Sequence, residues 1–154
     1  MTPDLHLQVA SAAPGLPAAA AIRRWAAAAL NGTGRRGEIT VRIVDAGESA
    51  ALNETYRRKA GPTNVLSFPF AAPPGVKSRL LGDIVLCAPL VAAEAAAQGK
   101  TAEAHWAHLV VHGVLHLLGY DHQHDTEAAA MEAEETRILA GLGYPDPYGD
   151  VNAP

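Results

Sequence analysis

Short apolar runs along the chain have the spacing of β-strands. In segments 5–9 and 38–44, apolar and polar residues alternate, which is typical of a strand with one buried face. Segments 65–68 and 80–87 are short and mostly apolar, and prolines flank them, as expected of strands with little solvent contact. The pattern therefore predicts strands in these four segments.

Longer segments between and after these runs have the end signals of helices. Pro17 suits the first turn of a helix, Thr101 is a good N-cap residue, and Gly119 follows the last periodic position of its segment. The expected helices cover residues 17–30, 48–59, 89–98, 101–118 and 126–139. Because strands and helices mix around one small sheet, we predict an α+β fold with about five helices. We expect a single domain over residues 1–154, with an irregular tail at 145–154.

The composition excludes several classes of protein. The chain has 154 residues and one cysteine, Cys87, so no internal disulfide forms and a reducing compartment fits. Cys87 lies in an apolar run, where a packed core thiol is expected. No apolar run approaches the ~20 residues that a membrane span needs. The cytoplasm is the expected location, with no membrane partner.

The charges are distributed unevenly. Residues 1–100 contain eleven Lys or Arg and seven Asp or Glu, whereas residues 101–154 contain one basic residue and nine acidic ones. The net charge of −4 taken alone argues against a nucleic-acid partner. Such an asymmetry can nevertheless place a basic face on an acidic protein. The alternative is that both parts simply carry solvated charges.

Three histidines have the spacing of a metal site. His112 and His116 are four residues apart on an expected helix, so their side chains share one face. Gly119 lets the chain leave the helix with positive φ and turn back, which brings His122 into reach. Neutral imidazole is a favoured zinc ligand, and three protein ligands leave a fourth position for a water whose pKa zinc lowers to about 7. We predict one zinc ion per chain, held by these three histidines near the end of the helix.

Neighbouring residues leave alternatives open. His124 competes with His122 as the third ligand. His105 and His108 lie within two turns upstream of the motif. They can support a ligand or face the substrate, although a core or surface role is the simpler interpretation. Asp121 can orient a ligand, take part in proton transfer or cap the turn.

The residue after the first histidine separates two kinds of chemistry. The spacing H-x3-H-x2-G-x2-H is that of metzincin proteases, in which a glutamate after the first histidine is the general base. Here that position is Gly113, which cannot transfer a proton. Because the metal-binding histidines are present and the protease base is absent, the sequence argues against peptide hydrolysis. A reaction at a phosphate group remains possible.

Two segments resemble a known family. Segment 52–70 contains the sequence T-N-V-L-S-F-P, and segment 104–122 contains the histidine motif. Together with segments 81–84 and 142–148, they resemble the YbeY family of bacterial rRNA maturation factors. The resemblance implies a single-strand-specific, metal-dependent endoribonuclease that acts in rRNA maturation, especially at the 3′ end of small-subunit rRNA, and in ribosome quality control. Implied partners are single-stranded ribosomal RNA and the ribosome or its proteins. The resemblance also implies the three histidines as zinc ligands and Arg57 as the functional arginine near the metal.

Arg57 also has a physical reason of its own. It belongs to Arg57-Arg58-Lys59, the densest basic cluster in the chain. A guanidinium can hold a phosphate by two hydrogen bonds and offset charge that develops during phosphoryl transfer. The alternative is a solvated helix end, where basic residues favour the dipole. We predict Arg57 and His112 as catalytic residues and Arg57, Arg58 and Lys59 as substrate-binding residues.

Several further expectations depend on this function. The basic part of the chain is expected to guide the RNA backbone while the acidic last helix faces away. Asn64 and Ser67 can line the site, whereas Phe68 is a candidate for the core. Two other functions fit the same residues: a ribosome-assembly factor with a structural zinc and little catalysis, and a metzincin-like metalloprotease or other hydrolase.

Overall fold

A computed structural model describes residues 4–120 and 125–149, and within these ranges it has one mixed sheet of four strands. The strands are β1 (Asp4–Ala10), β2 (Glu38–Val44), β3 (Val65–Pro69) and β4 (Leu80–Cys87), in the order β1-β2-β4-β3. β1, β2 and β4 run parallel, and β3 pairs antiparallel with β4 at one edge. The alternating and apolar runs thus form strands where the sequence predicts them.

The described ranges also contain five α-helices and one short π-helix. These are α1 (Ala19–Thr33), α2 (Ala46–Leu52), η1 (Asn53–Arg57), α3 (Ala88–Ala97), α4 (Ala102–Leu117) and α5 (Asp125–Leu142). The α+β fold is therefore confirmed. Two predicted boundaries are wrong: Ala18 is extended, so Pro17 precedes helix α1 instead of opening it, and segment 48–59 divides into α2 and η1.

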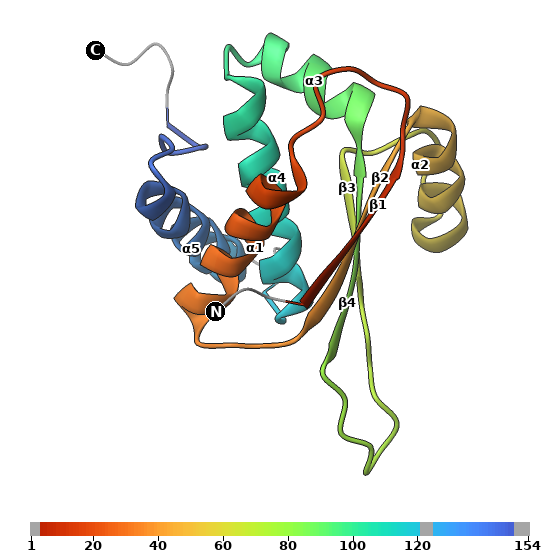
Figure 1. Ribbon diagram of the computed structural model, residues 1–154, viewed down its shortest axis with the longest axis vertical. Coiled ribbons are helices and arrows are strands. Elements are labelled where there is room, and N and C mark those ends of the chain that lie inside the picture. The colour runs from red at the N-terminus through yellow and green to blue at the C-terminus, as the bar shows by residue number, and fades with distance from the viewer. Residues whose placement is uncertain (1–3, 121–124, 150–154) are drawn as a thin grey trace.

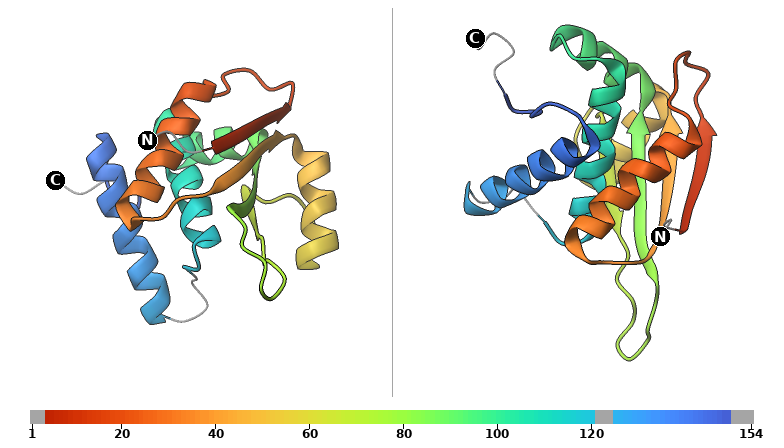
Figure 2. Two further views of the ribbon diagram at one scale, coloured as in Figure 1. Left: turned by 60° about the horizontal axis from the view of Figure 1, so that its bottom comes forward. Right: turned by 60° about the vertical axis from the view of Figure 1, so that its left-hand side comes forward.

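The helices cover the two faces of the sheet unequally (Figures 1 and 2). α1 and α4 lie on one face with α5 beyond them, and α2 lies on the opposite face. Ile39, Val41 and Ile43 alternate along β2 and are fully buried in the larger core. α4 contributes ten buried residues to this arrangement and lies between the sheet and α5. α4 is therefore the central helix of the fold.

The ends of α4 follow the expected signals. The Thr101 side chain accepts a hydrogen bond from the backbone N–H of Ala104 at 3.1 Å, which confirms the N-cap. Gly119 has φ 102° and donates to the carbonyl of His116, so the chain turns directly after the helix. The predicted ligand His122 lies outside the described residues, as do Asp121 and His124.

Three further features complete the architecture. The connection between β3 and β4 extends well beyond the sheet and is exposed to solvent (Figure 1). Cys87 is buried at the end of β4, as expected of a core thiol. Among the described helices, none combines the length and apolarity that crossing a membrane requires.

Candidate metal and phosphate site

One pocket brings together most of the residues that the sequence singles out. It has a volume of about 240 Å³ and is lined by His112 and His116 from α4 and by Arg57 from η1. Lys59, from the loop that follows η1, also lines it. Residues 63–67 complete the wall, so Asn64 and Ser67 line the pocket as expected, whereas Phe68 is absent from its described lining. Cationic side chains and imidazoles thus line one cavity.

The local fold of η1 explains how Arg57 and Lys59 reach the same pocket. Asn53 is buried and donates through Nδ2 to the carbonyl of Gly61 at 2.9 Å, which ties the start of η1 to the loop beyond it. Arg58 ends η1 in the left-handed conformation, with φ 55°. This conformation is unfavourable by roughly 1–2 kcal/mol for a residue other than glycine, so the surrounding contacts must hold it.

The left-handed turn separates the three basic residues. Arg57 and Lys59, on either side of it, line the pocket, whereas Arg58 is exposed and is not part of the lining. A role of Arg57 and Lys59 in binding substrate fits this placement. The same role for Arg58 stays a prediction that rests on sequence alone.

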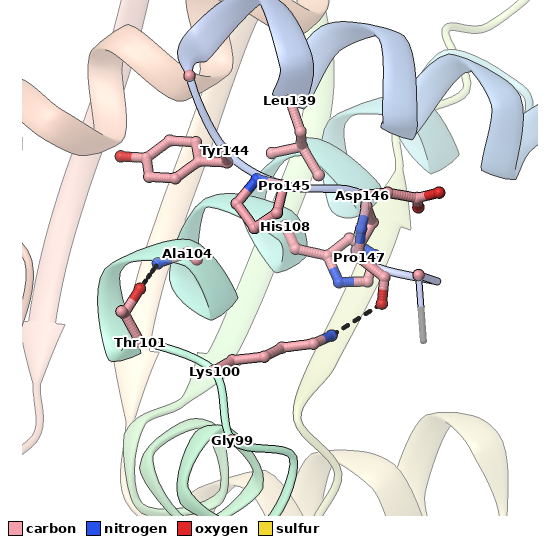
Figure 3. A pocket seen from close by; sticks show the side chains of 12 residues that line it. Gly99, Lys100, Thr101, Ala104, His108, Leu139, Tyr144, Pro145, Asp146 and Pro147 are labelled. Atoms are coloured by element: carbon pink, nitrogen blue, oxygen red, sulfur yellow. Dashed lines mark hydrogen bonds between the residues drawn. The ribbon is translucent and has the colours of Figure 1, made fainter. Parts of the chain in front are cut away.

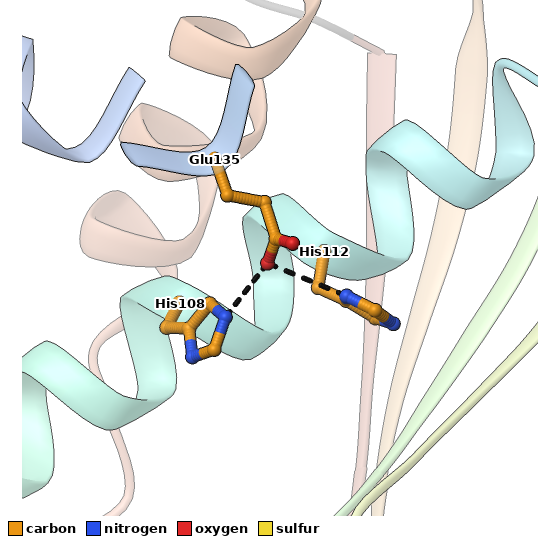
Figure 4. A group of neighbouring side chains, drawn as sticks. All are labelled: His108, His112 and Glu135. Carbon is orange, nitrogen blue, oxygen red and sulfur yellow. Dashed lines mark hydrogen bonds and ion pairs between the residues drawn. The ribbon is translucent and has the colours of Figure 1, made fainter. Parts of the chain in front are cut away.

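A buried carboxylate lies behind His112 (Figure 4). Glu135 of α5 has no solvent exposure, and its Oε2 lies 3.3 Å from Nδ1 of His112 and 2.7 Å from Nε2 of His108. Its Oε1 accepts a hydrogen bond from the hydroxyl of Tyr148 at 2.8 Å. The second ring nitrogen of His112 points away from Glu135 in Figure 4. Both carboxylate oxygens are thus engaged by groups from α4 and the C-terminal segment.

These contacts determine where the protons lie. Burial raises the pKa of Glu135, but the hydrogen bonds from His108 and His112 outweigh it and hold the pKa at about 2. Glu135 is therefore ionised at neutral pH and can only accept hydrogen bonds. When His112 is the neutral imidazole that binds a metal, its hydrogen bond to this carboxylate requires the proton on Nδ1 and leaves the lone pair on Nε2. Carboxylates arranged in this way behind histidines orient them as metal ligands.

The described residues offer a group that can hold a metal ion. Ligand atoms of His108, His112 and Glu135 all lie within 4.8 Å of one another. The predicted set, His112 and His116 with His122, shares one member with this group. A metal bound through Oε2 of Glu135 would have to displace the hydrogen bonds from both histidines. The chemistry of the donors therefore fits Glu135 better as an orienting group than as a ligand.

A second, partly buried chain of hydrogen bonds fixes Asn64 in the pocket wall. Asn64 Nδ2 donates to Glu94 at 3.0 Å, and Nε2 of His105 lies 2.9 Å from the same carboxylate oxygen. Burial lowers the pKa of His105, although Glu94 opposes this shift. A neutral His105 then donates from Nε2 to Glu94. Because Glu94 holds the side-chain amide nitrogen of Asn64, its side-chain oxygen Oδ1 is the atom that can accept a hydrogen bond.

The position of the missing protease base is filled by the sheet. A Cβ atom on Gly113 would lie 2.9 Å from Cγ2 and 3.1 Å from Cδ1 of Ile84 in β4. The carbonyl of Gly113 also accepts a hydrogen bond from the hydroxyl of Ser67 at 3.3 Å. Close packing of α4 on the sheet therefore leaves no room for a glutamate side chain. This packing gives the departure from the metzincin pattern a structural reason.

A larger pocket lies at the N-terminal half of α4 (Figure 3). It has a volume of about 570 Å³ and is mostly apolar, and His108 is one of its lining residues. Two of its polar side chains are engaged with nearby residues: Lys100 Nζ donates to the carbonyl of Pro147 at 3.0 Å, and the Tyr144 hydroxyl donates to Glu103 at 2.8 Å. The smaller pocket, with Arg57 and two of the predicted ligands, is the better candidate for phosphate chemistry.

The position of Glu135 goes beyond the sequence prediction. The acidic last helix does not face entirely away from the site, because Glu135 of α5 points inward to His108 and His112. The prediction that this helix faces away is wrong at that position. Glu135 could have been noticed from its spacing, since it falls on one stripe with Met131, Ile138 and Leu139, the other buried residues of α5.

Known proteins resemble this chain in sequence and in fold. The model of the YbeY family, described as endoribonuclease YbeY, matches residues 16–143. A protein of that name from Methylococcus capsulatus is 59% identical over 148 residues, which cover 96% of this chain and 97% of the relative. Another, from Nitrosococcus oceani, is 53% identical over 153 residues, or 98% and 100% of the two chains. A solution structure of a protein from Thermotoga maritima is similar in fold, with a TM-score of 0.59 and 22% identity over 96% of this chain and 99% of that one.

Proposed function

This chain belongs to the YbeY family, and on that premise we propose that it is a metal-dependent endoribonuclease that cleaves single-stranded RNA. The observation that supports this most directly is the pocket lined by Arg57, Lys59, His112 and His116. It combines phosphate-binding cations with the nitrogen ligands of a metal. Two roles in the cleavage of a phosphodiester, holding a metal ion and offsetting charge on the phosphate, therefore have candidate side chains there.

For the metal, we propose one zinc ion held by His112, His116 and His122. A bound zinc ion would activate a water or polarise a phosphate oxygen. Glu135 holds the proton of His112 on Nδ1 and so directs Nε2 toward the ligand position. Three imidazoles also accept nickel, copper or iron(II), so the preference for zinc rests on the chemistry of the ligands and on the family.

For the substrate, Arg57 is proposed to hold a phosphate and offset the charge that develops as the bond breaks. Lys59 adds a second positive charge on the same wall of the pocket. The substrate in the cell is proposed to be ribosomal RNA, at the 3′ end of the small-subunit species, with the ribosome or its proteins as partners and the cytoplasm as the location. These cellular assignments rest on the family alone.

The test is cleavage of single-stranded rRNA fragments by purified protein, with His116→Ala and Arg57→Ala variants assayed beside it. His6 and Arg36 are exposed in the structure, so His6→Ala and Arg36→Ala serve as matched controls. We expect loss of cleavage in the first pair only, with metal content lost in His116→Ala alone. A 2′,3′-cyclic phosphate product would identify the 2′-OH as nucleophile, and a 5′-phosphate end would identify water.

The same experiment separates the ribonuclease from its main rival. If all variants cleave equally, the activity belongs to a contaminant, and a zinc-stabilised ribosome-assembly factor becomes the better description. In that case, removing the metal should unfold the protein with no separable loss of activity. A metalloprotease is disfavoured because Gly113 packs against Ile84.

A further inference from the structure

An exposed aromatic side chain lies next to the proposed phosphate-binding arginine. Tyr56 is 64% exposed, yet its ring is held edge-on against Phe68, with ring centroids 5.2 Å apart and planes at 69°. Phe68 is itself half-buried on β3 and packs against the smaller core cluster of Val44, Leu66 and Val85. Tyr56 is thus an exposed ring whose orientation is supported from behind.

The two rings border a cavity that the proposed catalysis does not use. This cavity has a volume of about 460 Å³ and lies on the face of the sheet that α2 covers, beside η1. Its floor includes Thr40 of β2 and Asp83 of β4, which pairs in register with Phe68. We call it the aromatic cavity.

The lining of the aromatic cavity favours a neutral ligand over a phosphate, because it includes two acidic residues, Glu48 and Asp83, and one basic residue. Arg42 is the cation among its lining residues, and its guanidinium already donates to Glu48 at 2.9 Å and to Gln8 at 3.1 Å. That pairing leaves little positive charge to attract a phosphate. By contrast, Arg57 and Lys59 line the smaller pocket with His112 and His116, which we call the catalytic pocket. The catalytic pocket therefore suits a phosphate, and the aromatic cavity suits a base.

The chain connects the two cavities at the edge of the sheet. Along η1, Asn53 and Arg57 line the catalytic pocket, whereas Tyr56 lines the aromatic cavity. Along β3, Ser67 faces the catalytic pocket, and Phe68, the next residue, faces the aromatic cavity. β3 is one of the two edge strands of the sheet. A flexible strand of nucleotides can pass around this edge, with a phosphate at Arg57 and an adjacent base at Tyr56.

We propose that Tyr56, supported by Phe68, stacks a nucleobase of the single-stranded RNA whose phosphate lies in the catalytic pocket. This inference rests on the proposed function and adds a base subsite to it. Stacking on an aromatic side chain requires an unpaired base, because a base in a duplex is covered by its neighbours. The subsite therefore gives a physical reason for selecting single strands.

The experiment compares kcat/KM for one single-stranded RNA and for a series of copies, each lacking the base at one position. In the wild-type protein, one abasic position near the cleavage site should lower kcat/KM by about tenfold, the scale of one base–aromatic stacking contact. Tyr56→Ala should lower kcat/KM on the intact RNA by a similar factor, and the same abasic position should then have no further effect. Tyr56→Phe should behave as the wild type, because it keeps the ring.

Controls keep the outcomes distinct. Val9→Ala removes another exposed apolar side chain, 56% exposed on β1 and outside both cavities, and should change nothing. Thermal unfolding is measured for every variant, and Tyr56→Leu keeps an apolar side chain without the ring. This variant shows whether a loss of kcat/KM is due to the missing ring or to a destabilised fold. An abasic penalty that persists undiminished in Tyr56→Ala, or a Tyr56→Ala variant as active as the wild type, overturns the subsite alone. A wild-type protein that cleaves no RNA overturns the proposed function, and the subsite with it.

Discussion

Replacing Gly113 by alanine tests how closely α4 must approach the sheet. The added Cβ would lie 2.9 Å from Cγ2 of Ile84, roughly 0.6 Å inside the shortest normal separation of two carbon atoms. Ile84 is fully buried in β4 and is stiff at χ1, so it has little freedom to move. Overpacking of this kind is unfavourable by about 1–3 kcal/mol. Against it stands a gain of about 1 kcal/mol from replacing glycine inside a helix.

The net expectation is that Gly113→Ala lowers the free energy of unfolding by up to about 2 kcal/mol. Urea denaturation measures it, with Gly141→Ala as the matched control. Gly141 is also helical, but an added Cβ there meets no atom within 4 Å, so this change should be neutral or stabilising. Ile84→Ala alone should destabilise by about 2–5 kcal/mol, and the double variant by about 1–3 kcal/mol less than the sum. If Gly113→Ala raises stability as much as Gly141→Ala, the close approach of α4 has no energetic consequence and the reasoning is refuted.

The remaining predictions concern the polar groups around the site. Glu135→Gln should weaken metal binding by about 10- to 100-fold in competition with a chelator; unchanged affinity would contradict its orienting role. Because the folded-state pKa of Glu135 is about 2 against an ordinary 4.5, its contribution to stability is present above pH 4.5 and is lost as the pH falls toward 2. The difference in unfolding free energy between wild type and Glu135→Gln should shrink over that range, and a constant difference would exclude this explanation. Glu94→Ala should lower kcat/KM for RNA by about tenfold without loss of metal, since it releases Asn64; equal losses of metal and activity would argue for general disruption. RNA affinity should fall steeply as salt rises, because cations are released on binding, and titrations at several salt concentrations measure this slope.

The sequence predicts the sheet well because its strands follow local patterns. The alternation in β2 and the apolar run of β4 each reflect a burial pattern that is evident within a few consecutive residues. The division of segment 48–59 could not be predicted in this way. It depends on the hydrogen bond from the Asn53 side chain to Gly61 and on the left-handed backbone conformation of Arg58. Helical periodicity predicts neither of these features.

The candidate site also contains residues that local spacing predicts and one residue that it does not. The spacing of His112 and His116 within one helix already places them together, and the pocket brings Arg57 to them. Glu135 is 23 residues from His112, and its role depends on how α5 packs against α4. On the sequence it is one of several glutamates in an acidic helix. Tertiary packing, which turns this one inward, supplies the information that the local pattern lacks.

The central position of α4 has a consequence for how the protein opens. His112 and His116 lie on a helix enclosed by the sheet and by α1 and α5, whereas Arg57 lies on a π-helix of five residues with mostly exposed side chains. Backbone amides in the most enclosed elements exchange with solvent only on global unfolding, and those in short exposed turns exchange by local fluctuation. Deuterium uptake should therefore be slowest around Val110–Val114 and much faster in Asn53–Arg57. The proposed metal ligands His112 and His116 would then keep their positions through local openings of the segment that carries Arg57, the residue proposed to hold the RNA phosphate.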